Sequence, residues 1–175
     1  AFSSSSDTLV PGDSDGQADI FIYDRTTKTK ERISQPRLVI DSEDPLVGSG
    51  DSEWPSLSAD GRYVAFTSFS SLLVEHDTNE MGDVFLYDRT TQAIKRINVS
   101  STGEEANNHS FEPSISGDGR VVAFTSDADN LVSGDTNQAG DVFVYLAGSD
   151  TVKRISLKPS GEQNTSESRS AQTSN

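Results

Sequence analysis

The chain has 175 residues, the length of one ordinary domain, and its 14 basic and 28 acidic residues give a net charge of −14. Such an acidic field repels phosphate backbones and anionic lipid surfaces, so no nucleic acid is expected as a partner, and divalent cations are the natural counter-charge. The sequence has no cysteine, which excludes disulfides, thiolate metal sites and thiol catalysis. No apolar run approaches the ~20 residues of a membrane span. The chain starts at Ala1 without Met, which leaves two alternatives, a leader that was removed and one that was never included. The composition suggests an extracytoplasmic (periplasmic or secreted) location.

One pattern occurs three times along the chain. Residues 56–98 match residues 114–156 at 23 of 43 positions without a gap, and Asp60 and Asp118 mark a period of 58 residues. The N-terminal residues carry the same pattern from Ala1-Phe2 onwards. Units of this kind bury their apolar faces only against their neighbours, so the sequence predicts a repeat architecture.

The first unit, residues 1–34, is a partial copy. Its Ala1-Phe2 corresponds to the end of a second strand, an acidic loop opens at Asp13, and a third strand starts at Asp19. The first strand and the Asp-Gly turn of this unit are missing. Residues 35–54 are predicted to form an acidic connector.

Two complete units follow, residues 55–98 and 113–157, joined by a second connector at 99–112. The later unit predicts a short first strand, a β-branched second strand buried on both faces, a third strand, and an alternating fourth strand that faces solvent, at 113–116, 121–125, 142–145 and 152–156. An Asp-Gly dipeptide supplies the tight turn between the first two strands. Residues 158–175 are predicted to be a polar tail or a connector to a missing blade, mobile or held by a neighbouring molecule.

Three segments of the first complete unit resemble a known repeat family. Pro-Ser-Leu-Ser-Ala-Asp-Gly-Arg-Tyr-Val-Ala-Phe-Thr-Ser (55–68), Asp-Val-Phe-Leu-Tyr-Asp-Arg-Thr-Thr (83–91) and Lys-Arg-Ile (95–97) resemble the TolB-type, WD-like β-propeller repeat. The resemblance implies an all-β fold in which each blade is a four-stranded antiparallel sheet, here with two full blades plus a partial one. Since propellers close with about four to eight blades, an incomplete propeller is expected, either a fragment or a ring completed by oligomerisation. Exposed sheet edges favour self-association.

An acidic loop precedes the third strand of each unit, with the pattern Asp-x-[Asp/Asn]-x-x-x-Asp. Calcium prefers about six to eight oxygen ligands, and side-chain oxygens at alternating positions of a tight loop converge on one ion. The sequence therefore predicts a structural Ca²⁺ site in each loop, with the candidate ligands Asp13, Asp15, Asp19, Asp77, Asn79, Asp83, Asp135, Asn137 and Asp141.

Two alternatives to calcium stay open for these loops. Asp and Asn in turns often hydrogen-bond their own backbone without an ion, and the Asp before each third strand could cap the loop or pair with the arginine of a neighbouring blade. An arginine recurs on the fourth strand of each unit and is predicted to face solvent or to pair between blades, at Arg32, Arg96 and Arg154.

No catalytic constellation is visible in the sequence. Neither His76 nor His109 recurs between units, and there is no Gly-x-Ser-x-Gly elbow and no phosphate-binding glycine loop. The sequence therefore predicts a non-enzymatic propeller module that acts as a scaffold or protein-interaction surface. A carbohydrate-binding module, suggested by Trp54, and an accessory propeller domain of a larger hydrolase are the alternatives, because the propeller fold alone does not specify function.

Overall fold

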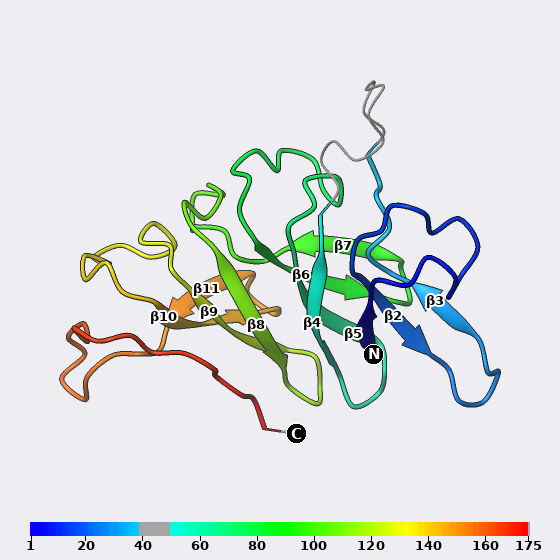
Figure 1. The fold of residues 1–175 in the computed structure, drawn as a ribbon. Coiled ribbons are helices and arrows are strands. Elements are labelled where there is room, and N and C mark those ends of the chain that lie inside the picture. The colour runs from blue at the N-terminus through cyan, green and yellow to red at the C-terminus, as the bar shows by residue number, and fades with distance from the viewer. Residues whose placement is uncertain (39–49, 175) are drawn as a thin grey trace.

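A computed structural model describes residues 1–38 and 50–174 of the chain. Within these ranges the protein is all-β, and its eleven strands form three antiparallel sheets that lie side by side (Figure 1). The described residues include no helix long and apolar enough to cross a membrane.

Strands that are consecutive in the chain pair within each sheet, as expected for propeller blades. The first sheet has three strands, β1 (Phe2–Ser4), β2 (Asp19–Tyr23) and β3 (Lys30–Arg32). The second sheet consists of β4 (Ser52–Leu57), β5 (Tyr63–Ser68), β6 (Asp83–Asp88) and β7 (Ala93–Arg96). The third consists of β8 (Ser110–Ile115), β9 (Val121–Ser126), β10 (Asp141–Leu146) and β11 (Thr151–Arg154). Two complete blades and one partial blade confirm the predicted fold class, an incomplete β-propeller.

The hydrophobic core lies between neighbouring blades. One buried cluster joins the first and second blades and another joins the second and third. Within each blade, a phenylalanine of one strand stacks on a phenylalanine of the next, with ring centroids 5.6, 5.7 and 5.8 Å apart, in the pairs Phe2–Phe21, Phe66–Phe85 and Phe124–Phe143. This arrangement confirms the predicted repeat architecture, because each blade depends on the next for its apolar contacts.

The first strands of the complete blades start earlier than predicted. β4 begins at Ser52 and β8 at Ser110, three residues before the predicted blade starts at 55 and 113. A register shift interrupts each strand, and the shifted residues Trp54 and Glu112 have left-handed backbones with φ of 51° and 54°. The bulge breaks the two-residue alternation, so the sequence pattern misses the start of the strand. The predicted connector 35–54 otherwise falls largely on residues 39–49, outside the described residues.

The predicted tail packs against its own chain. Residues 158–174 follow the third blade, and the last of them run alongside β8 (Figure 1). Ser168 N–H donates to the carbonyl of Gly140 at 2.8 Å, and Ser170 Oγ–H donates to Glu112 Oε2 at 2.9 Å. This segment therefore has defined contacts with the third blade, although it lacks an apolar period.

Candidate functional sites in the acidic loops and on the first strands

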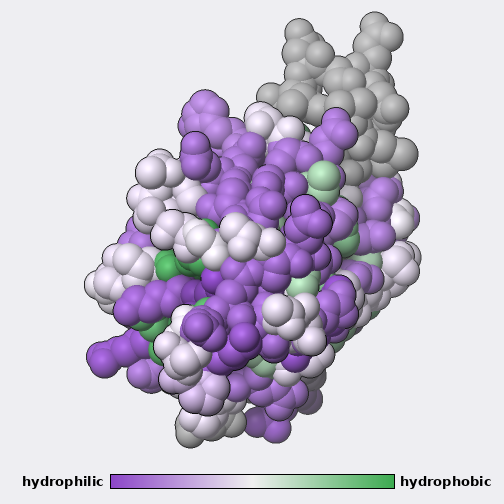
Figure 2. Space-filling view, turned by 90° about the vertical axis from the view of Figure 1, so that its left-hand side faces the viewer, coloured by the Kyte–Doolittle hydropathy of each residue, from purple (hydrophilic) through white to green (hydrophobic). Residues whose placement is uncertain are grey.

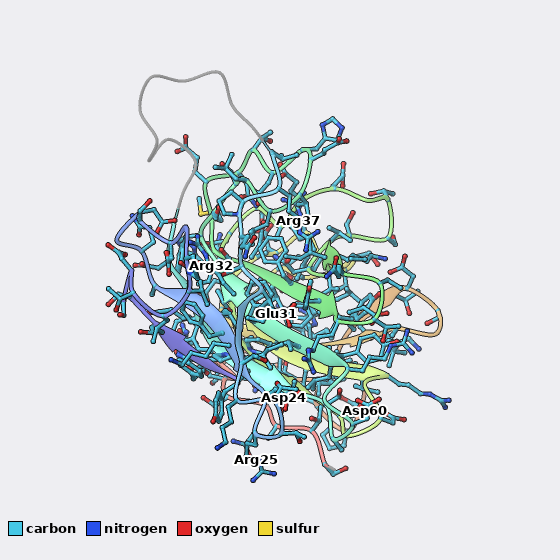
Figure 3. The ribbon with its side chains drawn as sticks, turned by 90° about the vertical axis from the view of Figure 1, so that its right-hand side faces the viewer. Asp24, Arg25, Glu31, Arg32, Arg37 and Asp60 are labelled. Carbon is cyan, nitrogen blue, oxygen red and sulfur yellow. The ribbon has the colours of Figure 1, made fainter. Side chains whose placement is uncertain are left out.

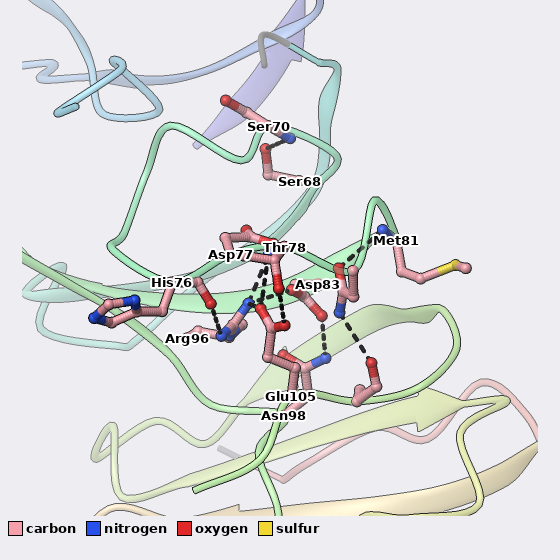
Figure 4. Close-up of polar contacts among 12 residues, drawn as sticks. Ser68, Ser70, His76, Asp77, Thr78, Met81, Asp83, Arg96, Asn98 and Glu105 are labelled. Carbon is pink, nitrogen blue, oxygen red and sulfur yellow. Dashed lines mark hydrogen bonds and ion pairs between the residues drawn. The ribbon is translucent and has the colours of Figure 1, made fainter. Parts of the chain in front are cut away.

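A buried arginine occupies the centre of the acidic loop in the second blade. The guanidinium Nη1 of Arg96 lies 3.2 Å from Asp77 Oδ1, 3.1 Å from Asp83 Oδ2 and 2.7 Å from Glu105 Oε1 (Figure 4). Its Nη2 donates to the carbonyl of His76 at 2.9 Å. Only 8 % of the arginine side chain is exposed. The guanidinium therefore supplies positive charge inside the loop that the sequence assigned to calcium.

The same arrangement recurs in the other two blades. Arg32 pairs with Asp13 at 2.6 Å and with Asp15 and Asp19 at 2.9 Å. Arg154 pairs with Asp135 at 2.7 Å and Asp141 at 3.3 Å. The prediction that these arginines face solvent or pair between blades is wrong, because each side chain is buried and pairs with the acidic loop of its own blade. Arg96 also pairs with Glu105 of the connector that follows.

Figure 3 shows where this cluster lies in the first blade. Arg32 lies beside the acidic loop, whereas Asp24 and Arg25 lie at the opposite end of the sheet. Asp24 Oδ1 accepts the backbone N–H groups of Thr26 and Thr27, which is a local turn interaction. Asp24 and Arg25 thus belong to a turn, and the charged cluster around Arg32 lies at the other end of the sheet.

The last aspartate of each loop has a second partner after the fourth strand. Asn98 Nδ2 donates to Asp83 Oδ1 at 2.6 Å, and Asn98 Oδ1 accepts the N–H of Val84 at 3.1 Å. Ser34 and Ser156 bind Asp19 and Asp141 in the same way, at 2.6 and 2.5 Å. Sequence reasoning missed these three residues, although the repeated Arg-Ile-[Ser/Asn] signals them.

The middle position of each loop forms an Asx-type turn. Asn79 Oδ1 accepts the N–H of Met81 at 2.9 Å, and its Nδ2 donates to the carbonyl of Ala106 at 2.9 Å. Asn137 makes the equivalent pair of contacts with Ala139 and Asn164, at 3.1 and 2.8 Å. The oxygen of each amide thus closes a turn within the loop, and its nitrogen joins the loop to the connector that follows the blade.

Burial controls the titration of these carboxyl groups. It raises the pKa of Asp19 and of Asp77 to about 6, because the loss of hydration outweighs the stabilising effect of the neighbouring arginine. Burial also raises the pKa of Asp83 and of Asp135. Glu105 differs, because hydrogen bonds from Thr78 and Arg96 outweigh its burial and lower its pKa.

We expect the protein to gain stability when the pH falls from about 7.5 to about 5.5. The folded pKa of Asp19 and Asp77 is about 6, above the ordinary 3.8, so between these values the folded state binds more protons than the unfolded state. The free energy of unfolding therefore rises as the pH decreases through this window. Melting temperatures at several pH values measure the effect.

A matched pair of variants isolates this contribution from the general relief of acidic repulsion. Asp77→Asn removes one of the titrating groups and flattens the pH profile, whereas Asp118→Asn leaves it unchanged, because Asp118 is exposed and its pKa is lowered by a hydrogen bond from Ser116. A pH profile that is identical in the wild type and in Asp77→Asn would contradict the assignment.

Only one group of three metal-binding side chains converges among the described residues. Oxygens of Asp7, Asp13 and Asp15 lie within 4.8 Å of one another in the first loop. Asp7 was not among the predicted ligands, since it has no counterpart in the loop pattern. Among the described residues, the first loop thus brings more carboxylates together than the other two.

A second candidate site is an aromatic patch formed by Trp54 of β4, Phe111 of β8, Phe69 directly after β5 and His109 directly before β8. These residues line a hollow of about 300 Å³ together with Glu112 and Asp127. The rings of Trp54 and Phe111 are 6.3 Å apart, and those of Phe69 and His109 are 5.8 Å apart. Trp54 and Phe69 are each 43 % exposed, so the patch presents aromatic surface to solvent.

The bulge in β4 is what exposes the tryptophan. A non-glycine residue with positive φ costs free energy, and such strained positions are enriched at functional sites. The patch continues into a groove of about 400 Å³ lined by Trp54, Pro55, Glu112 and Pro113. The only tryptophan of the chain thus lies where two hollows meet.

An arginine near the C-terminus of the same chain contacts this patch. The guanidinium carbon of Arg169 lies 5.1 Å from the centre of the Phe111 ring, and its Nη2 lies 3.4 Å from Asp127 Oδ1. Stacking on the ring and pairing with the carboxylate are two ways to hold a cation. The patch therefore combines aromatic faces with acidic groups.

No family model and no curated protein matches the sequence. Among solved structures, TolB from Acinetobacter baumannii is 23 % identical with a TM-score of 0.45, covering 83 % of this chain and 28 % of that one. A putative TolB from Agrobacterium tumefaciens is 18 % identical with a TM-score of 0.49, covering 81 % and 42 %. The tricorn protease is 17 % identical with a TM-score of 0.45, covering 73 % and 11 %.

The chain spans less than half the length of each of these structures. Its own sheets carry the fold assignment, since two four-stranded meanders and a three-stranded one pack through repeated aromatic cores. The described part of the protein is an incomplete β-propeller.

Proposed function

We propose that this protein is a non-enzymatic propeller module whose aromatic patch binds a protein segment with a basic side chain. The observation that supports this most directly is Trp54, held exposed by a strained bulge beside Phe111, Glu112 and Asp127. Tryptophan and arginine dominate the energetics of protein interfaces. The net charge of −14 also favours basic partners through long-range attraction.

The two histidines fit this proposal better than an enzymatic one. His109 Nδ1 accepts the backbone N–H of Gly82 at 2.8 Å, and its ring packs on Phe69. His76 contributes its backbone carbonyl to the arginine cluster. The His109 ring therefore has a structural role, whereas His76 contributes through its backbone.

We expect Trp54→Ala to weaken the binding of basic peptides by at least about tenfold, since truncating a central aromatic residue of an interface costs upwards of about 2 kcal/mol. An array of short peptides that differ only in one position, occupied by Arg, Lys, Gln or Glu, measures the preference. The arginine peptides should bind best and the glutamate peptides worst.

Leu57→Ala is the control for this prediction. Leu57 lies on the same strand and is 38 % exposed, but it does not line the patch. Equal binding of acidic and basic peptides would refute the proposed specificity. Equal affinities of Trp54→Ala and Leu57→Ala would refute the proposed location.

Carbohydrate binding is a second candidate, supported by the exposed face of Trp54, on which a sugar ring could stack. A glycan array distinguishes the two candidates, because a sugar ligand would bind without any basic group. The role of an accessory domain in a larger hydrolase is tested by the reading frame that surrounds this sequence.

Calcium stabilisation is a separate part of the proposal, limited to the loop of the first blade. Four acidic residues, Asp7, Asp13, Asp15 and Asp19, face a single arginine there, so the cluster keeps an excess of negative charge. Calcium should raise the melting temperature relative to chelator, and Asp7→Asn should remove the difference. A melting temperature that calcium leaves unchanged would count against any such ion. An extracytoplasmic location stays a prediction of the sequence.

A further inference from the structure

His109 connects the aromatic patch to the acidic loop of the second blade. It lies directly before β8, and its Nδ1 accepts the backbone N–H of Gly82 at 2.8 Å. Its ring packs against Phe69, with the ring centroids 5.8 Å apart. Phe69 approaches Gly82 so closely that a Cβ atom at Gly82 would lie 2.8 Å from the Phe69 ring. His109 and Phe69 together therefore hold the last residue of this loop beside the patch.

This contact requires the uncharged form of the imidazole. A ring nitrogen that accepts a hydrogen bond carries no proton, so the neutral ring of His109 has its proton on Nε2. Protonation of Nδ1 would bring two donors to within 2.8 Å of each other and would end the bond to Gly82. Histidine changes its charge between about pH 5 and 8. The bond is therefore present at the upper end of this range and is lost as the pH falls.

An aspartate makes the same contact between the first and second blades. Asp51 lies 58 residues before His109 and directly before β4, and its Oδ1 accepts the N–H of Ala18 at 2.7 Å. The backbone carbonyls of Asp51 and His109 accept equivalent N–H groups, those of Phe69 and Asp127, both at 2.9 Å. An oxygen of a carboxyl group can accept a hydrogen bond in either charge state. Of these two contacts, only the histidine's depends on the loss of a proton.

The charged groups around His109 are mainly acidic. Glu112 and Asp127 line the same hollow. Arg169 is the cation on this side, and its Nη2 lies 3.4 Å from Asp127 Oδ1. The acidic loop contributes Asp83, whose carboxylate is already paired with a buried guanidinium. A protonated imidazole would therefore add a positive charge beside two carboxylates that face a single arginine.

The surroundings of these two carboxylates favour recognition through charge. Glu112 belongs to β8, and Asp127 directly follows β9, so both lie in the third blade. The side of the molecule that this blade forms is mainly hydrophilic, with small and separate hydrophobic areas (Figure 2). Complementary charges steer a partner to such a surface. A change of one unit of charge in the hollow therefore alters the attraction for a basic side chain.

We propose that His109 is a pH-dependent switch of the aromatic patch. At neutral pH the uncharged ring holds Gly82 and leaves the patch with an excess of carboxylates. As the pH falls, the imidazolium releases the N–H of Gly82 and offsets the charge of Glu112 and Asp127. The release of Gly82 needs no ligand, whereas the lower affinity for basic side chains rests on the function proposed above.

Hydrogen exchange of the Gly82 amide tests the release without a ligand. We expect its protection factor, the ratio of the intrinsic to the observed exchange rate, to fall about tenfold between about pH 7.5 and about pH 5.5, as for the loss of one hydrogen bond. His109→Asn keeps an acceptor near the position of Nδ1 but has no charge to change, so its protection factor should not fall. His76→Asn changes the only other histidine, which is exposed, and should behave like the wild type.

The affinity for an arginine-containing peptide tests the effect on the patch. It should fall about threefold over the same pH range in the wild type, the effect of one added charge in a solvated site, and should stay constant in His109→Asn. All other acidic groups titrate in both proteins, so the difference between them belongs to His109.

The two measurements separate the possible failures. A Gly82 protection factor that stays constant in the wild type, or that falls equally in His109→Asn, would overturn the switch. Equal pH dependence of peptide affinity in the two proteins would overturn its effect on the patch. Peptides that bind at neither pH would refute the proposed function, and the exchange of Gly82 would still decide whether His109 releases the loop.

Discussion

Replacing Arg96 by methionine is expected to lower the free energy of unfolding by about 3–5 kcal/mol, the typical cost of removing one partner from a buried ion pair. Asp77, Asp83 and Glu105 would lose the only guanidinium they share, while their burial would continue to disfavour the charged form. Methionine preserves most of the side-chain volume, so the lost free energy of unfolding comes from the missing charge rather than from poorer packing. Chemical denaturation at neutral pH measures it.

The pH dependence of this variant distinguishes lost charge from lost structure. Because Asp77 already has a raised pKa, the carboxyl groups of Arg96→Met can take up protons in the folded state as the pH falls. The destabilisation should therefore be smaller at about pH 5 than at about pH 7.5. Arg154→Met should have a smaller effect, since Gln163 stands where the second blade has Glu105.

Arg120→Met is the matched control. Its side chain is 82 % exposed and lies 3.8 Å from Asp118, so its removal should cost less than about 1 kcal/mol. If Arg96→Met and Arg120→Met lowered the free energy of unfolding equally, the guanidinium in the loop would not stabilise the blade.

Phe85→Ala is expected to cost about 3–5 kcal/mol. Phe85 is fully buried, stacks on Phe66 at 5.7 Å, and belongs to the cluster that joins the first and second blades. Its removal leaves a cavity that two blades share, so both should become less stable together. Equilibrium denaturation gives the free energy, and hydrogen exchange shows which strands open.

Phe69→Ala provides the same chemical change at an exposed position. Phe69 is 43 % exposed and touches Gly82, so its truncation should cost less than half as much. If the two variants lost equal stability, or if only the second blade opened in Phe85→Ala, the shared core would not be what joins the blades.

The repeat pattern was sufficient to predict the blades. The Asp-Gly turns form as expected, with φ of 72° at Gly61 and 73° at Gly119, and the second strands are buried on both faces. The starts of β4 and β8 could not be predicted in the same way. Their bulges place polar residues out of alternation, and the following Pro55 and Pro113 lack a backbone donor and argue against a strand.

The partners of the acidic loops were only partly predictable. Sequence spacing brings Asp77 and Asp83 together, but it does not show that the loop folds over Arg96. Arginine on an alternating outer strand is usually exposed, so periodicity assigns it to solvent. The repetition of Arg-Ile-[Ser/Asn] at this position was the signal that connects the fourth strand to the loop.

The aromatic patch was also beyond the repeat pattern. Phe69, His109 and Phe111 have no counterparts at equivalent positions of all three units, so no period singles them out. They meet Trp54 only because two neighbouring blades bring the starts of β4 and β8 together. Such a site depends on the angle between blades, which a single repeat does not encode.

A buried guanidinium holds each acidic loop to its own blade. Nuclear magnetic resonance of the arginine side chains tests it most directly, through the exchange of the guanidinium protons with water. We predict slow exchange for Arg32, Arg96 and Arg154 and fast exchange for Arg120, in the presence of a calcium chelator. If the guanidinium protons of the three loop arginines exchanged as fast as those of Arg120, these arginines would not be buried in the acidic loops and would not hold them.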